Sequence, residues 1–159
     1  MSSLTRFLIA IPAYYLAAIL EMNAHRFAIF GVEPQFLLTT GLVFALFGSP
    51  AGGATAGAAS GILQGALAGA NMVAYGISRT IAGFALSFVP RVGVVVRAGV
   101  GFVAVFAASL VANLVLIFLA PRPDLSSALG STITSAIYNG VIATPFCALF
   151  GVAGRQSSR

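Results

Sequence analysis

Charge is the scarcest property of this 159-residue chain. Only 7% of its residues are charged, namely 8 basic and 3 acidic residues. A soluble domain carries about 25% charged residues, which would be roughly 40 here. So few charges cannot cover the surface of a water-soluble globule. The shortage therefore excludes a cytosolic enzyme and a disordered tail, and a single cysteine, Cys147, excludes a disulfide scaffold.

Groups that carry chemistry are equally rare. There is one histidine, His25, with no nearby cluster of Cys, Asp or Glu, so no metal site is expected. Cys147 has no histidine or acid near it in sequence and resembles a small apolar core residue. No paired carboxylates, serine motif or phosphate-binding loop occur. We therefore expect no catalytic activity, no cofactor and no metal.

Apolar residues are abundant, at 59% of the chain, and they occur in long runs. A membrane-spanning helix needs about 20 apolar residues, so six spans of roughly 26 residues with their loops fit the length. The sequence predicts an all-α integral membrane protein, a compact bundle of six helices in one membrane domain. The expected spans are residues 7–20, 34–47, 51–70, 72–89, 92–120 and 129–153.

Turn residues separate these spans. Gly48, Ser49 and Pro50 indicate one turn, and Asn71 indicates another. Pro90 and Arg91 close the fourth span, and the segment 121–124 breaks the chain before the sixth. Glu21 and Glu33 are expected in a polar segment outside the membrane after the first span. The first span is interpreted as a retained helix rather than a signal peptide, because no small-residue cleavage site follows Leu20.

All eight basic residues are arginines, and their placement predicts the orientation. Arginines gather in cytoplasmic loops. With both termini inside, Arg26 and Arg122 lie outside and five lie on the cytoplasmic side: Arg6, Arg91, Arg97, Arg155 and Arg159. The positive charge therefore serves topology, and no nucleic-acid partner is needed to explain it.

Five glycines recur at every fourth residue of the third span, which places them on one helix face: Gly53, Gly57, Gly61, Gly65 and Gly69. Such a face lets another helix backbone approach closely in lipid. It could pack against a helix of the same chain or against a partner's membrane helix. Gly76 and Gly83, with Thr80 between them, predict a second, smaller groove on the fourth span.

Arg79 is predicted at membrane depth, where an arginine costs about 2.5–3.5 kcal/mol. It could extend toward the outer interface, or it could face a polar interior, where it would suit an anionic group such as a lipid phosphate. Its candidate acceptors are Gln64, Asn113, Tyr138 and Asn139. Asn113 and Asn139 could equally form simple hydrogen bonds between helices.

Four segments of the chain resemble the MreD family, the membrane subunit of the bacterial rod-shape machinery. They are the Glu-Pro-Gln-Phe-Leu-Leu at 33–38, the glycine-spaced stretch 53–64, Gly-Ala-Asn-Met-Val-Ala-Tyr at 69–75 and Ile-Tyr-Asn-Gly-Val-Ile-Ala-Thr-Pro-Phe at 137–146. Gln35 and Gln64 stand where that family usually has aspartates. A charged pair between position 64 and Arg79 is therefore expected to be absent.

The resemblance implies a non-catalytic scaffold in the inner (cytoplasmic) membrane of a bacterial cell. Its fold would be similar to the substrate-binding subunits of energy-coupling-factor transporters. Its implied partner is MreC, a single-span coiled-coil protein, in a larger complex with RodA, PBP2 and MreB filaments that directs peptidoglycan synthesis. A phospholipid is a further expected partner. The alternative function is the substrate-binding subunit of a transporter for a small, vitamin-like molecule.

Overall fold

The computed structural model describes residues 3–92, 98–121 and 124–156. Within them the regular secondary structure is helical, and the only strand-like feature is an isolated bridge between Ile29 and Val32. Six α-helices are present in these ranges, as the composition predicts: α1 (Ser3–Met22), α2 (Phe36–Leu46), α3 (Pro50–Leu67), α4 (Met72–Leu86), α5 (Ala98–Leu119) and α6 (Leu125–Gln156). Two short 3₁₀ helices, η1 (Ala24–Phe27) and η2 (Val89–Val92), follow α1 and α4.

Local turn residues determine where α3 begins and how it connects to α4. Ser49 caps α3, because its side chain accepts a hydrogen bond from the Gly52 N–H, and Pro50 occupies the first turn. Gly69 follows α3 with φ +59°, a left-handed conformation that glycine adopts without strain. The Asn71 side chain then accepts the Val73 and Ala74 N–H groups and starts α4. The turns predicted at 48–50 and at Asn71 are therefore present.

Several helix ends differ from the predicted spans; α3, for example, ends at Leu67 rather than 70, and α4 ends at Leu86 rather than 89. α1 continues past Leu20 and includes Glu21 in its last turn, so the prediction that Glu21 belongs to a polar segment after the helix is wrong. α6 starts at Leu125 rather than at 129, because Asp124 accepts the Ser127 N–H and caps the helix. The predicted start of the fifth span includes residues 93–97, which lie outside the described residues, as do Arg97, Arg122 and Arg159.

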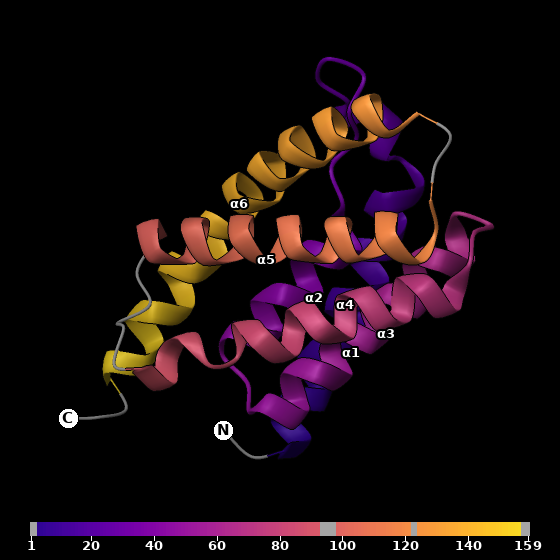
Figure 1. Ribbon diagram of the computed structural model, residues 1–159. Helices are drawn as coiled ribbons and strands as arrows, with labels where there is room; N and C mark the ends of the chain where they lie inside the picture. Colours follow the sequence, from indigo (N-terminus) through magenta and orange to yellow (C-terminus); the bar gives the residue numbers. More distant parts are fainter. Residues whose placement is uncertain (1–2, 93–97, 122–123, 157–159) are drawn as a thin grey trace.

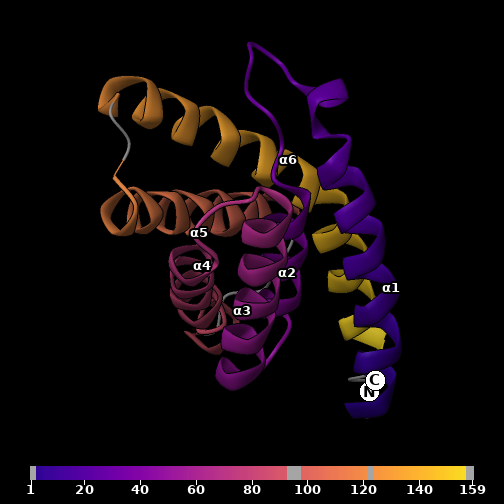
Figure 2. The same ribbon diagram turned by 90° about the vertical axis from the view of Figure 1, so that its right-hand side faces the viewer.

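α2 lies at the centre of the molecule and contacts α1, α3, α4, α5 and α6. It is apolar on all sides, which is the pattern of a fully buried helix. Its leucines have no exposed surface, and they form the core with residues of α4, α5 and α6, including Ala82, Val105 and Ala143. Figure 2 shows α2 enclosed between α1 on one side and α3 and α4 on the other.

The most extensive helix contacts are between α3 and α4 and between α5 and α6. α5 runs across the direction of α1 rather than parallel to it (Figures 1 and 2). α6 changes direction along its length, and it contains Pro145, which cannot donate a helical hydrogen bond. The start of α1 and the end of α6 lie at the same end of the molecule (Figure 2).

Three helical segments of the described chain are long and apolar enough to cross a membrane, namely Met72–Val92, Ala98–Leu119 and Leu125–Leu149. Two further apolar helices, Leu8–Met22 and Phe36–Leu46, are shorter. α3 has 18 residues and is built largely from glycine and alanine.

Candidate functional site

Arg79 occupies the centre of a polar network. It lies on α4 with no exposed surface. Its Nε donates to Gln64 Oε1 (3.2 Å), Nη1 donates to Ser78 Oγ (2.9 Å) and to the Ala112 carbonyl (3.3 Å), and Nη2 donates to Asn113 Oδ1 (3.2 Å). These acceptors come from α3, α4 and α5, so one guanidinium joins three helices.

The surroundings of Arg79 show which of two positions it takes: extended toward the outer interface, or facing a polar interior. Its guanidinium carbon lies 4.7 Å from the centre of the Tyr75 ring, a favourable cation–π distance. The side chain points into the bundle and does not reach the surface. Of its expected acceptors, Tyr138 lies elsewhere, because its hydroxyl donates to the Phe27 carbonyl (2.8 Å). The guanidinium therefore does not lie open to an anion from outside.

Glu21 brings a carboxylate to the network, which the sequence interpretation missed. Its Oε1 accepts Nε2 of Gln64 (2.7 Å), and its Oε2 accepts the Leu37 N–H (3.0 Å). Gln64 thus stands between the carboxylate of Glu21 and the guanidinium of Arg79. Ala17, one helical turn before Glu21, is only 3% exposed, so continuing α1 by one turn points Glu21 inward. Because the burial of Ala17 is known only from the structure, the sequence carried no comparable signal for Glu21.

Gln35 extends the network from α5 to α6. Its Oε1 accepts Nδ2 of Asn113 (3.2 Å) and Nδ2 of Asn139 (3.2 Å), and its N–H donates to Asn139 Oδ1 (3.1 Å). Asn139 also donates to Ser109 (3.3 Å) and is fully buried. Five helices contribute a side chain each to one hydrogen-bonded network, and α2 contributes its N-cap residue Gln35 and the Leu37 N–H. We call this network the polar network; its side chains are Glu21, Gln35, Gln64, Arg79, Asn113 and Asn139.

The glycine face of α3 packs against α4 of the same chain. A Cβ at Gly53 would lie 2.6 Å from the Gly83 carbonyl, and Cβ atoms at Gly57 and Gly61 would collide with the backbone carbonyls of Arg79 and Tyr75. Gly65 faces the Cα of Met72 in the same way (2.8 Å). Of the two occupants considered for this face, the structure thus places an internal helix there. Gly83 belongs to that contact, and Gly69 belongs to the turn.

Gly76 borders the α3–α4 contact, because a Cβ at Gly61 would lie 2.9 Å from the Gly76 Cα, but the space in the direction of its own Cβ is nearly open. A Cβ there would meet only Ile62 Cγ1, at 3.6 Å. It lies in an apolar depression of about 520 Å³ on the outer surface of α3 and α4, which we call the outer groove. Its lining residues are Ala58, Ile62, Met72, Val73, Gly76, Ile77, Thr80 and Ile81.

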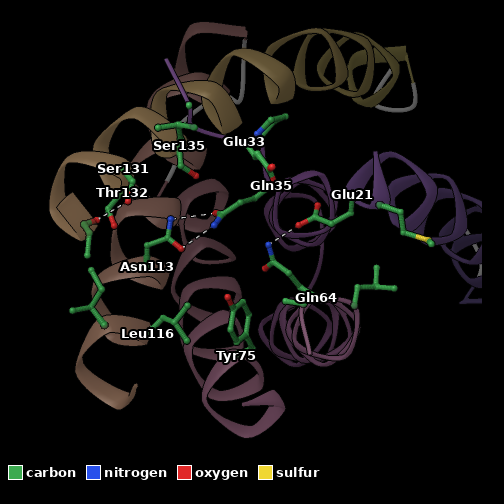
Figure 3. Close-up of a pocket in the computed structure, with 18 residues that line it drawn as sticks. Glu21, Glu33, Gln35, Gln64, Tyr75, Asn113, Leu116, Ser131, Thr132 and Ser135 are labelled. Atoms are coloured by element: carbon green, nitrogen blue, oxygen red, sulfur yellow. Dashed lines mark hydrogen bonds between the residues drawn. The ribbon is translucent and has the colours of Figure 1, made fainter. Parts of the chain in front are cut away.

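A cavity of about 500 Å³ adjoins the polar network where α1 and α3 end and α4 and α6 begin. It is lined by most of the network residues and by hydroxyl side chains of α6. Figure 3 shows Ser131, Thr132 and Ser135 on one side and Glu21 and Gln64 on the other. The lining comprises Glu21, Met22, Gly31, Val32, Glu33, Pro34, Gln35, Gln64, Leu67, Ala68, Tyr75, Asn113, Leu116, Ile117, Ala128, Ser131, Thr132 and Ser135.

The remaining candidate residues lie apart from this cavity. His25 is exposed in η1, and Cys147 is buried in α6 against Gly101. In the described part of the chain, no three His, Cys, Asp or Glu side chains lie close enough together to hold a metal ion.

Comparisons with protein-family models, with curated proteins and with solved structures found no match for this chain. The resemblance to MreD therefore stays a prediction from the sequence.

Proposed function

We propose that the chain is a multi-pass protein of the bacterial inner membrane and a non-catalytic scaffold subunit of MreD type. One observation carries the membrane assignment, namely an inverted distribution of polarity. Arg79 and Asn139 are fully buried, whereas large apolar side chains are exposed on several helices, with Leu8 65%, Val103 61% and Phe118 84% exposed. Such a molecule would be insoluble in water, but it suits a lipid environment.

We propose six membrane crossings on the basis of this distribution rather than of helix length, since three of the described helical segments are long enough to cross by themselves. In lipid, polar groups need partners within the protein, and the polar network supplies such partners to buried groups from all six helices. The start of α1 and the end of α6 lie at one end of the molecule, as an even number of crossings requires (Figure 2). The arginine distribution favours the cytoplasm for that end.

The scaffold role needs a surface for a partner, and the outer groove is the best candidate. Its lining is apolar, and Gly76 and Thr80 are four residues apart, so they leave a shallow surface on one face of α4. We propose that the single membrane helix of an MreC-like protein packs there. Through that partner the chain would join RodA, PBP2 and MreB in a complex for cell elongation.

Two glycine variants test this docking. Gly76→Leu places a side chain in the outer groove, where only Ile62 lies within 4 Å, so the fold should be retained. Gly99→Leu, on α5 with no atom within 4 Å, is the matched control. When each is co-expressed with a tagged MreC-like protein, we expect Gly76→Leu to lose co-purification and Gly99→Leu to retain it. Equal retention by both variants would reject the groove as the docking site.

A second candidate function has its own supporting observation. The cavity of about 500 Å³ lies within the range of ligand-binding pockets, about 300–1,000 Å³. It would suit the substrate-binding subunit of a small-molecule membrane transporter. Native mass spectrometry of the purified protein separates the two functions, because a tightly retained metabolite favours transport, whereas phospholipid or an empty protein favours the scaffold.

A further inference from the structure

The cavity beside the polar network contains a polar group without a partner. Ser135 on α6 lines the cavity and is 4% exposed, and its hydroxyl is the buried side-chain oxygen or nitrogen that makes no hydrogen bond within the described residues. Leaving a buried hydroxyl unpaired costs about 1–3 kcal/mol. The neighbouring Ser131, in contrast, donates to the Ala128 carbonyl (3.0 Å). Ser135 is therefore placed to bind something that enters the cavity.

The charges around the cavity determine what could enter. Two carboxylates, Glu21 and Glu33, belong to its lining, and no arginine does. Arg79 lies behind the lining and gives its N–H groups to Gln64, Ser78, Asn113 and Ala112. An anion would meet negative charge without an accessible cation, whereas a positively charged group would be attracted.

The remaining lining groups suit hydroxyls. Amide groups of Gln35, Gln64 and Asn113 and side-chain hydroxyls of Tyr75, Ser131, Thr132 and Ser135 surround the space (Figure 3). The amide nitrogens of Gln35, Gln64 and Asn113 each use one of their two N–H donors within the polar network, so the second donor of each can serve a hydroxyl of a bound molecule. Glu33 belongs to the lining and is exposed, so its carboxylate is accessible from the surface.

We propose that this cavity binds a small, hydroxyl-rich organic cation, with its ammonium group toward Glu21 and Glu33 and a hydroxyl paired with Ser135. Under the proposed orientation the cavity faces the outer side of the membrane. Binding there deepens the second candidate function and rests on it. It is independent of partner docking in the outer groove, so either proposal can fail alone.

Three probes with the same hydroxylated carbon chain test the charge preference, namely N-methylglucamine, sorbitol and gluconate. They carry a positive, a neutral and a negative end group. We expect the full chain in detergent to show saturable binding of N-methylglucamine by calorimetry at millimolar concentrations, weaker binding of sorbitol and none of gluconate. Equal heats for all three probes, or none for any of them, would overturn the proposal.

Ser135→Ala separates binding from folding. Because the hydroxyl has no partner, its removal should leave the melting temperature of the unliganded protein unchanged or higher. The same variant should weaken N-methylglucamine binding about fivefold, the loss of one hydrogen bond. Thr134→Ala is the matched control, because Thr134 is the adjacent residue and does not line the cavity. If Ser135→Ala binds like Thr134→Ala, Ser135 is not a ligand.

Glu33→Gln tests the charge without disturbing the polar network, because Glu33 is exposed. We expect this variant to fold normally. The ratio of its affinity for N-methylglucamine to its affinity for sorbitol should be smaller than in the unmodified protein. An unchanged preference would contradict the assignment of the ammonium end to the carboxylates.

Discussion

Nε of Arg79 donates to Oε1 of Gln64 over 3.2 Å, inside the bundle and away from any exposed surface. This bond fixes the orientation of the Gln64 amide, because the carboxamide nitrogen must then face the carboxylate of Glu21 (2.7 Å). A neutral side chain thus relays hydrogen bonding between the partly buried carboxylate of Glu21 and the fully buried guanidinium of Arg79.

Arg79→Leu should destabilise the protein strongly. It removes the donors to Gln64, Asn113 and Ala112 and leaves the Glu21 carboxylate without a compensating cation. Breaking a buried ionic arrangement from one side costs about 3–5 kcal/mol. Arg79→Lys should lose less, because the charge remains. Cys147, the only cysteine and fully buried, reports unfolding through its reaction with a thiol reagent.

The control for Arg79 is Arg91→Leu. Arg91 is exposed in η2, with its guanidinium carbon 5.9 Å from the Phe88 ring, so a change within about 0.5 kcal/mol is expected. If Arg79→Leu labelled at Cys147 no faster than Arg91→Leu, the polar network would not stabilise the fold.

Exchanging Glu21 and Gln64 should preserve the polar network. Gln64→Glu alone brings two carboxylates together at the 2.7 Å contact and should be destabilising. The double variant, Glu21→Gln with Gln64→Glu, restores an amide donor facing a carboxylate and pairs the carboxylate introduced at position 64 directly with Arg79. It also keeps an acceptor for the Leu37 N–H. The change in the free energy of unfolding of the double variant, measured by thermal unfolding, should therefore differ from the sum of the changes of the two single variants by about 1–3 kcal/mol. Additive effects would argue against the relay through Gln64.

Gly57→Ala should weaken the α3–α4 packing. The added methyl would collide with the backbone carbonyl of Arg79, which cannot move without separating the helices. Overpacking of this kind costs about 1–3 kcal/mol. Gly99→Ala has no atom within 4 Å and should instead stabilise α5, by about 1 kcal/mol at most. If the melting temperatures of Gly57→Ala and Gly99→Ala shifted in the same direction, the close approach of α4 to Gly57 would be contradicted.

The first turn of α6 should lose protection against amide hydrogen exchange at low pH. Hydrogen bonds from the Ser126 and Ser127 side chains, and from the Ser127 N–H, hold the pKa of Asp124 below its usual range. Because the folded pKa is lowered, the stabilisation is present above the ordinary aspartate value, about 3.9, and is lost as the pH falls through the folded value. Hydrogen exchange at the Ser127 amide, corrected for its intrinsic rate, should show this loss. Asp124→Asn keeps a capping acceptor without titrating, so an identical pH profile in that variant would refute Asp124 as the cause.

The sequence alone was enough for the helical class and for several helix ends. Ser49, Pro50 and Asn71 determine their turns through local hydrogen bonds that depend on nearby residues only. Likewise, the four-residue spacing of Gly53, Gly57, Gly61 and Gly65 determines that α3 has a face for close packing, because helix periodicity places them together.

Only the tertiary structure decided which residues pack against each helix face. Gly53 could face any helix, and only the fold places Gly83 of α4 against it. Glu21 looked like a loop residue, and only the continuation of α1 beside α3 brings it to Gln64. Gln35 and Asn139 are 104 positions apart, yet they share two hydrogen bonds. Local periodicity sets which side chains share a helix face, whereas the pairing of faces depends on packing all six helices at once.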